Sequence, residues 1–172
     1  MVAYQVEDTF TCSANYYWNM FFSAPYNEGL WEFLEIERVE EKFCRTGTEL
    51  DEEIVRVHRL TPRREVPAIM KKLISGAITY VEHNHFRRRE NAMQVKTTTG
   101  FLADKFSANG VYRLEEIEPR VVQRIWQGEC TCTIPLIGDK IARLIADEIK
   151  RSYEKTSEFT HRWIADHPEV AR

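Results

Sequence analysis

The sequence has few of the residues that mark specialised protein classes. Seven glycines and six prolines among 172 residues exclude a collagen-like or low-complexity chain. No stretch approaches the roughly 18 apolar residues of a membrane-spanning helix. The first residues lack the basic and apolar regions of a signal peptide, which predicts a cytoplasmic protein. With 43% hydrophobic and 30% charged residues, the composition is typical of a globular chain with a buried core.

Cysteine is also scarce, and its four positions include no C-x-x-C pair. Cys12 and Cys44 are isolated in the sequence. Cys130 and Cys132 are two positions apart in a strand-like run, where side chains share a face but lie too far apart for an easy disulfide. We therefore expect four reduced thiols, as in a cytosolic protein.

The charge is uneven along the chain, although its total is only −3. Residues 54–96 hold ten lysines and arginines against three acids, a net charge of +7, and the remainder carries −10. Such a basic region either attracts phosphates or an anionic membrane surface, or forms solvated strand edges and loops. The basic residues are not interleaved with aromatic ones, so a nucleic-acid partner is not expected.

The first elements predicted are a strand over Val2–Phe10 and two short helices. Ser13 fits the N-cap of a helix over Ala14–Phe22, and Pro25 fits the first turn of a second helix that ends near Leu34. Nearly half of the aromatic residues of the chain lie in this region. They form either a packed aromatic core or one wall of an apolar pocket.

Six strand candidates follow, longer than the roughly five to six residues usual for strands, which predicts a strongly curved antiparallel sheet. In one of them, Arg56 and His58 share a face with Leu60, opposite Val55 and Val57, as in a sheet with one solvated face. The candidates are Ile36–Arg45, Ile54–Leu60, Ala77–Arg88, Ala92–Phe101, Phe106–Ile117 and Val121–Ile134.

Residues 66–76 interrupt the strands with a short basic amphipathic helix. Pro67 fits its first turn and Gly76 the position after its last, whereas Lys71 and Lys72 lie off the apolar stripe. The segment either packs on the sheet or forms a mobile flap that contacts lipid. In the second case the segment gates a binding site, and it also contacts an anionic membrane peripherally. The residues expected to do so are Ile69, Met70, Lys71, Lys72 and Leu73.

A long amphipathic helix is predicted over Gly138–Ala165, after Pro135 ends the last strand and before Pro168. Its apolar stripe runs from Ile137 to Trp163, and the helix is about 40 Å long at 1.5 Å per residue. A helix with one such stripe needs an equally long surface to cover. The sequence therefore predicts an α+β fold, in which a curved antiparallel sheet of six to seven strands wraps around the C-terminal helix.

This order of elements resembles the START-like (helix-grip, SRPBCC) superfamily over nearly the whole chain. The most telling segment is the junction Ile134-Pro-Leu-Ile-Gly138 that leads into the helix. Within the superfamily, the chain is most similar to a bacterial family of unknown function. Other similar segments are Glu65-Val-Pro-Ala68, Tyr80-Val-Glu82, Gly110-Val-Tyr-Arg-Leu114 and Glu158-Phe-Thr-His-Arg-Trp163.

The resemblance implies a single START-like domain over residues 1–172 that binds a lipid or another hydrophobic small molecule. It supplies no catalytic residues and no cofactor. The candidate site is a cavity between sheet and helix, and small residues such as Gly128, Ala142 and Ala146 favour open space there over a filled core. The candidate lining residues are Trp31, Tyr80, Tyr112, Leu114, Trp126, Cys130, Cys132, Ile141, Leu144, Ile145, Ile149 and Tyr153.

Two other functions remain open at this point. A protein-interaction or regulatory module would have a filled core and an exposed apolar patch. An enzyme of the cyclase or aromatase type would need polar groups directed into the cavity. The candidates for such groups are Tyr80, Tyr112, Tyr153 and Arg124.

No metal site is expected from the sequence. His83 and His85 share a strand face and form a plausible pair of ligands. A third ligand is not evident, and Arg87 continues the same face, where it would repel a cation.

Overall fold

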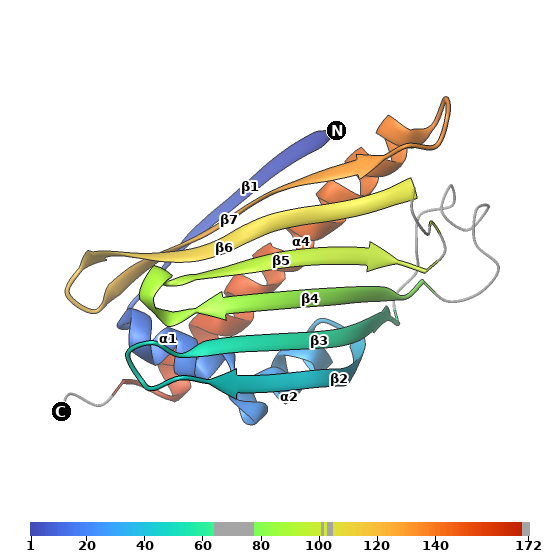
Figure 1. Cartoon of the computed structure of the whole chain (residues 1–172). Coiled ribbons are helices and arrows are strands. Elements are labelled where there is room, and N and C mark those ends of the chain that lie inside the picture. Colours follow the sequence, from blue (N-terminus) through green and yellow to red (C-terminus); the bar gives the residue numbers. More distant parts are fainter. Residues whose placement is uncertain (64–77, 101, 103–104, 170–172) are drawn as a thin grey trace.

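The computed structural model describes residues 1–63, 78–100, 102 and 105–169. Within these residues the elements follow the predicted order (Figure 1). They are β1 (Val2–Phe10), α1 (Ala14–Phe21), α2 (Ala24–Phe33), β2 (Ile36–Thr46), β3 (Glu53–Pro62), β4 (Tyr80–Arg87), the 3-10 turn η1 (Arg88–Glu90), β5 (Ala92–Thr99), β6 (Phe106–Glu118), β7 (Val121–Cys132) and α4 (Gly138–Asp166).

The predicted basic helix over residues 66–76 lies outside the described residues. The same holds for the proposed gate residues Ile69, Met70, Lys71, Lys72 and Leu73.

The strands form one seven-stranded antiparallel sheet in the order β1-β7-β6-β5-β4-β3-β2. Each strand from β2 to β6 pairs with the next in sequence, and β1 pairs with β7. Register shifts in β2, between Glu40 and Lys42, and in β6, between Glu116 and Glu118, are of the kind that bends and twists a strand. The sheet curves around α4, as predicted (Figure 1).

The helices cover different parts of the inner face of the sheet. α4 contacts β1 and β7 and also α2, and α2 contacts β2. Serine caps hold the two short helices in place: Ser13 Oγ accepts from the Tyr16 N–H at 3.1 Å, and Ser23 Oγ accepts from the Tyr26 N–H at 3.4 Å. The inner face of the middle strands therefore lies opposite the region where α2 and α4 meet.

An aromatic cluster joins α1 to the sheet. Trp18 is fully buried, and its ring centroid lies 4.5 Å from that of Phe86 on β4 and 5.7 Å from that of Tyr112 on β6. The hydroxyls of Tyr17 and Tyr112 are hydrogen-bonded to each other. The aromatic-rich N-terminal region is therefore mainly packed core.

Small residues allow close approach instead of leaving empty space. A Cβ atom on Gly128 would lie 2.7 Å from Tyr4 Oη, so the Tyr4 ring fills the space above this glycine. Ala142 and Ala146 are 0% and 1% exposed in the core. The expectation that these three positions leave a cavity was therefore wrong.

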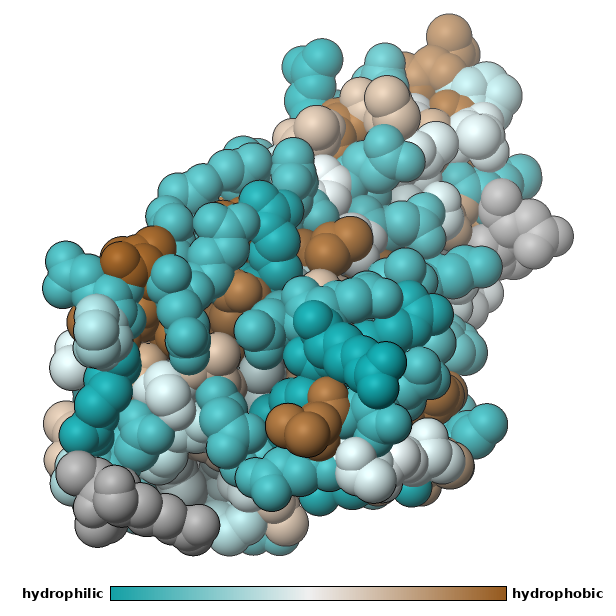
Figure 2. All heavy atoms as spheres, turned by 60° about the vertical axis from the view of Figure 1, so that its left-hand side comes forward, coloured by the Kyte–Doolittle hydropathy of each residue, from teal (hydrophilic) through white to brown (hydrophobic). Residues whose placement is uncertain are grey.

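The visible face of the space-filling view is mostly hydrophilic, with hydrophobic residues separated from one another (Figure 2). The large hydrophobic residues that are most exposed lie on different segments, such as Val39 on β2, Ile117 on β6, and Leu50 and Leu136 in two connections. All four cysteines are free. No helix in the described part of the chain is long and apolar enough to cross a membrane.

Candidate functional site

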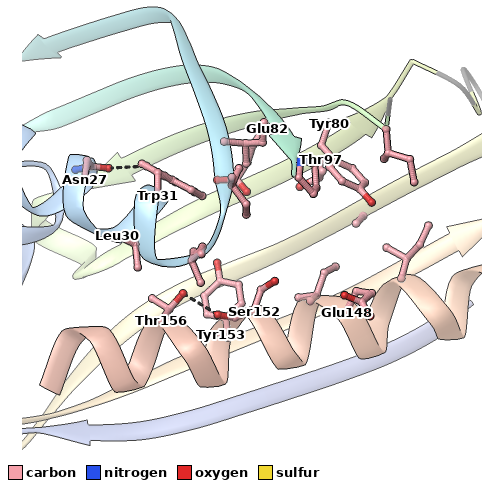
Figure 3. Close-up of a pocket in the computed structure, with 18 of the residues that line it drawn as sticks. Asn27, Leu30, Trp31, Tyr80, Glu82, Thr97, Glu148, Ser152, Tyr153 and Thr156 are labelled. Atoms are coloured by element: carbon pink, nitrogen blue, oxygen red, sulfur yellow. Dashed lines mark hydrogen bonds between the residues drawn. The ribbon is translucent and has the colours of Figure 1, made fainter. Parts of the chain in front are cut away.

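A cavity of about 170 Å³ lies between the sheet and the helices. Its walls come mainly from α2, from the inner faces of β3 to β6, and from the first two thirds of α4 (Figure 3), with Phe21 of α1 and Ile36 of β2 at the margin of these elements. An apolar cavity of about 150 Å³ is large enough to hold benzene, so this one has the size for a compact ring system. Most of its wall is apolar, including Leu30, Leu34, Leu60, Met93, Phe106 and Ile149.

Half of the twelve predicted lining residues lie in this wall. α2 contributes Trp31, and β4 contributes Tyr80. In Figure 3, Tyr80 lies on the sheet side of the cavity, opposite the α4 residue Tyr153. The other α4 residues from the prediction that line the cavity are Leu144, Ile145 and Ile149.

The other six predicted residues lie in the packed core and do not line the cavity. α4 lies directly on β1 and β7, so it covers the inner face of β7 instead of leaving a space there. The Trp126 ring, for example, stacks on Tyr153 with 5.2 Å between centroids. The six are Tyr112, Leu114, Trp126, Cys130, Cys132 and Ile141, each at most 9% exposed.

A buried arginine that was not predicted lies in the cavity wall. Arg56 on β3 is only 2% exposed. Its Nε donates to Asn84 Oδ1 at 2.9 Å and its Nη1 to Asn27 Oδ1 at 3.2 Å. The Trp31 indole N–H donates to the same Asn27 oxygen at 3.3 Å, so α2 is tied to the sheet through this group.

Glu82 on β4 is the acidic counterpart of Arg56 in the wall. Its Oε1 lies 3.0 Å from His58 Nε2 and accepts from Asn84 Nδ2 at 2.9 Å. Arg38 Nε donates to His58 Nδ1 at 3.1 Å, which leaves that nitrogen without a proton. His58 therefore carries its proton on Nε2 and donates it to Glu82.

The pKa values of Arg56 and Glu82 indicate that both side chains are charged at neutral pH. Burial lowers the pKa of Arg56 to about 10, which leaves it protonated at neutral pH. Burial by itself raises the pKa of Glu82, but the contacts of its carboxylate with His58, Asn84 and Arg56 outweigh burial and hold the pKa at about 2. Burial lowers the pKa of His58, in agreement with a neutral ring. Arg56 and Glu82 thus place a cation and an anion in the cavity wall.

The inward position of these polar residues is indicated by the two-residue periodicity of their strands. Arg56 and His58 are in phase with Ile54 and Leu60, which are buried on the inner face. Glu82 has the same two-residue phase as Phe86, which is also buried on the inner face. The polar side of β3 therefore faces the cavity, and the solvated side carries valines.

A second buried guanidinium lies outside the cavity wall. Arg124 on β7 is 0% exposed, and its Nη2 donates to the Tyr153 carbonyl at 3.3 Å and to Ser157 Oγ. Its cationic group lies over the rings of Phe10 and Tyr112, at 5.0 and 5.8 Å from their centroids. Of the polar groups considered for an enzyme, Tyr80 and Tyr153 line the cavity, whereas Arg124 and Tyr112 are core residues.

The histidine pair considered for metal binding lies on the other side of the sheet. His83 is exposed, and His85 Nε2 lies 3.2 Å from Glu53 Oε2, within hydrogen-bond distance. No group of three or more potential metal ligands occurs among the described residues.

Two solved structures are similar to this chain over nearly its whole length. The protein TTHA0849 from Thermus thermophilus has a TM-score of 0.60 and 13% sequence identity, with 98% of this chain and 100% of that chain covered. The Zhui aromatase/cyclase from Streptomyces sp. R1128 has a TM-score of 0.61 and 10% identity, with 98% of each chain covered. Identities this low show a common fold and nothing more about function.

No curated protein matches the sequence. A family model described as "Protein of unknown function (DUF2505)" matches residues 5–164, and the chain therefore belongs to that family.

Proposed function

We propose that this protein is a START-like carrier or sensor that binds a hydrophobic small molecule between its sheet and α4. The observation that carries this proposal is the cavity of about 170 Å³ with its mainly apolar wall. Sites for small molecules are concave and mainly apolar with a few polar groups, which describes the wall of this cavity. Its volume favours a compact molecule over a lipid with two acyl chains.

An enzyme of the cyclase or aromatase type is the second candidate. It is supported by the likeness to the Zhui aromatase/cyclase and by the titratable groups in the cavity wall. Proton transfer is most efficient when the pKa of the catalytic group is near the working pH. The pKa values of about 2 for Glu82 and about 10 for Arg56 are far from neutrality, so these groups suit ligand binding better.

The remaining sequence-based proposals concern partners. A protein-interaction module with a filled core is disfavoured by the cavity. Contact of Lys71 and Lys72 with an anionic membrane is proposed on their sequence pattern alone.

The experiment that tests the binding function is organic extraction of the purified protein followed by mass spectrometry. We expect a hydrophobic molecule at a stoichiometry near one per chain. Where the expression host does not make the ligand, we expect naphthalene, a neutral fluorescent probe, to bind the extracted and refolded protein at one site. An empty extract together with no uptake of naphthalene would contradict the proposal and favour the interaction module.

A further inference from the structure

In the cavity wall, one amide side chain bridges a cation and an anion. Asn84 Oδ1 accepts from Arg56 Nε at 2.9 Å, and Asn84 Nδ2 donates to Glu82 Oε1 at 2.9 Å. Arg56 and Glu82 therefore flank Asn84 on the adjacent strands β3 and β4. Both charged residues line the cavity, so together they present one donor group and one acceptor group to a ligand.

Each charged group keeps hydrogen-bonding capacity that no other described residue uses. Arg56 donates through Nε and Nη1, and none of the hydrogen bonds among the described residues involves its Nη2. Glu82 accepts both of its bonds at Oε1, and none among the same residues reaches Oε2. The Glu82 side chain keeps 19% exposure while it lines the cavity. Hydrogen bonds to charged groups are stronger than those between neutral groups, so a ligand that bonds to both residues gains affinity.

The charges in the wall select the kind of polar group that fits. A carboxylate would accept from Arg56 but would lie close to Glu82. Glu148 also lines the cavity, on α4, where it is paired with Arg151 at 3.1 Å (Figure 3). An ammonium group would lie close to Arg56. A hydroxyl can accept from a guanidinium and donate to a carboxylate, and it brings no charge into a buried site.

We infer that the ligand of this cavity is a neutral hydrophobic molecule with a hydroxyl group, a phenol or an alcohol, and that its hydroxyl bonds to Arg56 and Glu82. Fatty and aromatic acids are rejected by the same wall. This inference rests on the proposed binding function and adds the chemical class of the ligand.

The test uses three probes that share the naphthalene ring system and differ in one substituent, on the whole protein at pH 7: 2-naphthol, 2-methylnaphthalene and 2-naphthoic acid, which is ionised at this pH. Dissociation constants are measured by competition with naphthalene fluorescence. We expect 2-naphthol to bind at least tenfold more tightly than 2-methylnaphthalene, because only the hydroxyl completes the polar contacts. We expect it to bind at least tenfold more tightly than 2-naphthoate, because only the acid places a second anion near Glu82.

The substitution Glu82→Gln removes the negative charge of this side chain and keeps its shape, so it tests the effect of the charge alone. The amide keeps an oxygen for His58 and Asn84 but removes the negative charge. We expect the affinity for 2-naphthoate to rise at least tenfold in this variant. Glu129→Gln is the matched control, since Glu129 is exposed on β7 and absent from the cavity wall, and the ranking should stay as in the wild type.

The outcomes distinguish this inference from the proposed function. If none of the three probes binds, the binding function fails, and the inference fails with it. If all three bind with equal affinity, or if 2-naphthoate binds most tightly, the cavity still binds hydrophobic molecules but the selection for a neutral hydroxyl is overturned. If Glu82→Gln does not fold, as a melting curve would show, the ranking of the probes on the wild type decides.

Discussion

The substitution Ala108→Phe is expected to abolish the uptake of naphthalene. Ala108 on β6 is 3% exposed and lines the cavity, so a larger side chain at this position extends into the space. The added phenyl ring is comparable in size to the benzene that a cavity of about 150 Å³ holds. We expect the affinity to fall at least about a hundredfold, or about 2.7 kcal/mol, in a fluorescence titration.

The adjacent substitution Asn109→Phe is the control for Ala108→Phe. Asn109 is exposed and points to the opposite face of the same strand, so the same ring is added outside the cavity. This variant should keep the wild-type affinity. Uptake of naphthalene by Ala108→Phe at the wild-type affinity would place the probe elsewhere on the protein and would contradict the assigned site. A melting curve verifies that both variants are folded.

The substitution Trp18→Ala is expected to lower the free energy of unfolding by about 3–5 kcal/mol, the usual cost of truncating a buried tryptophan. Trp18 is fully buried and packs against Phe22 at the C-cap of α1, Phe86 on β4 and Tyr112 on β6. Its removal leaves a cavity that these rings cannot close. Because whole domains are stable by only about 5–15 kcal/mol, urea unfolding should show a large shift of the midpoint.

Trp18→Phe keeps one aromatic ring at the same position and should cost less than half as much as Trp18→Ala. A loss below about 1 kcal/mol for Trp18→Ala would contradict the account of the N-terminal aromatics as packed core. It would instead indicate that the region is open enough to serve as a pocket wall. Phe21 and Trp31 are the members of the region that do line the cavity.

The order of the elements was predictable because it depends on local signals. Hydrophobic periodicity identified every strand, and Ser13 marked the start of α1. The strand ends differ where long-range hydrogen bonds decide them. β7 ends at Cys132 instead of Ile134, and the Ile134 carbonyl accepts from the Gly138 N–H at 2.8 Å in the turn that begins α4.

The cavity was only partly predictable, because alternation tells which residues of a strand face inward but not which part of the inner face a helix covers. Trp126 and Cys130 face inward as predicted, but α4 lies on β7 and buries them in the core. Arg56 was not predicted as a cavity residue because polar residues on an alternating strand usually face solvent. Its inward position depends on Asn27 and Asn84, which come from two other elements.

The central claim is that a hydrophobic molecule binds between the sheet and α4, and the location of bound naphthalene by NMR tests it most directly. Intermolecular nuclear Overhauser effects to methyl-labelled protein report which side chains touch the probe. We expect contacts with the methyl groups of Met93, Leu144 and Ile149, which line the cavity. Contacts only with Val55 and Val111 on the outer face of the sheet, or none at saturating naphthalene, would contradict the claim.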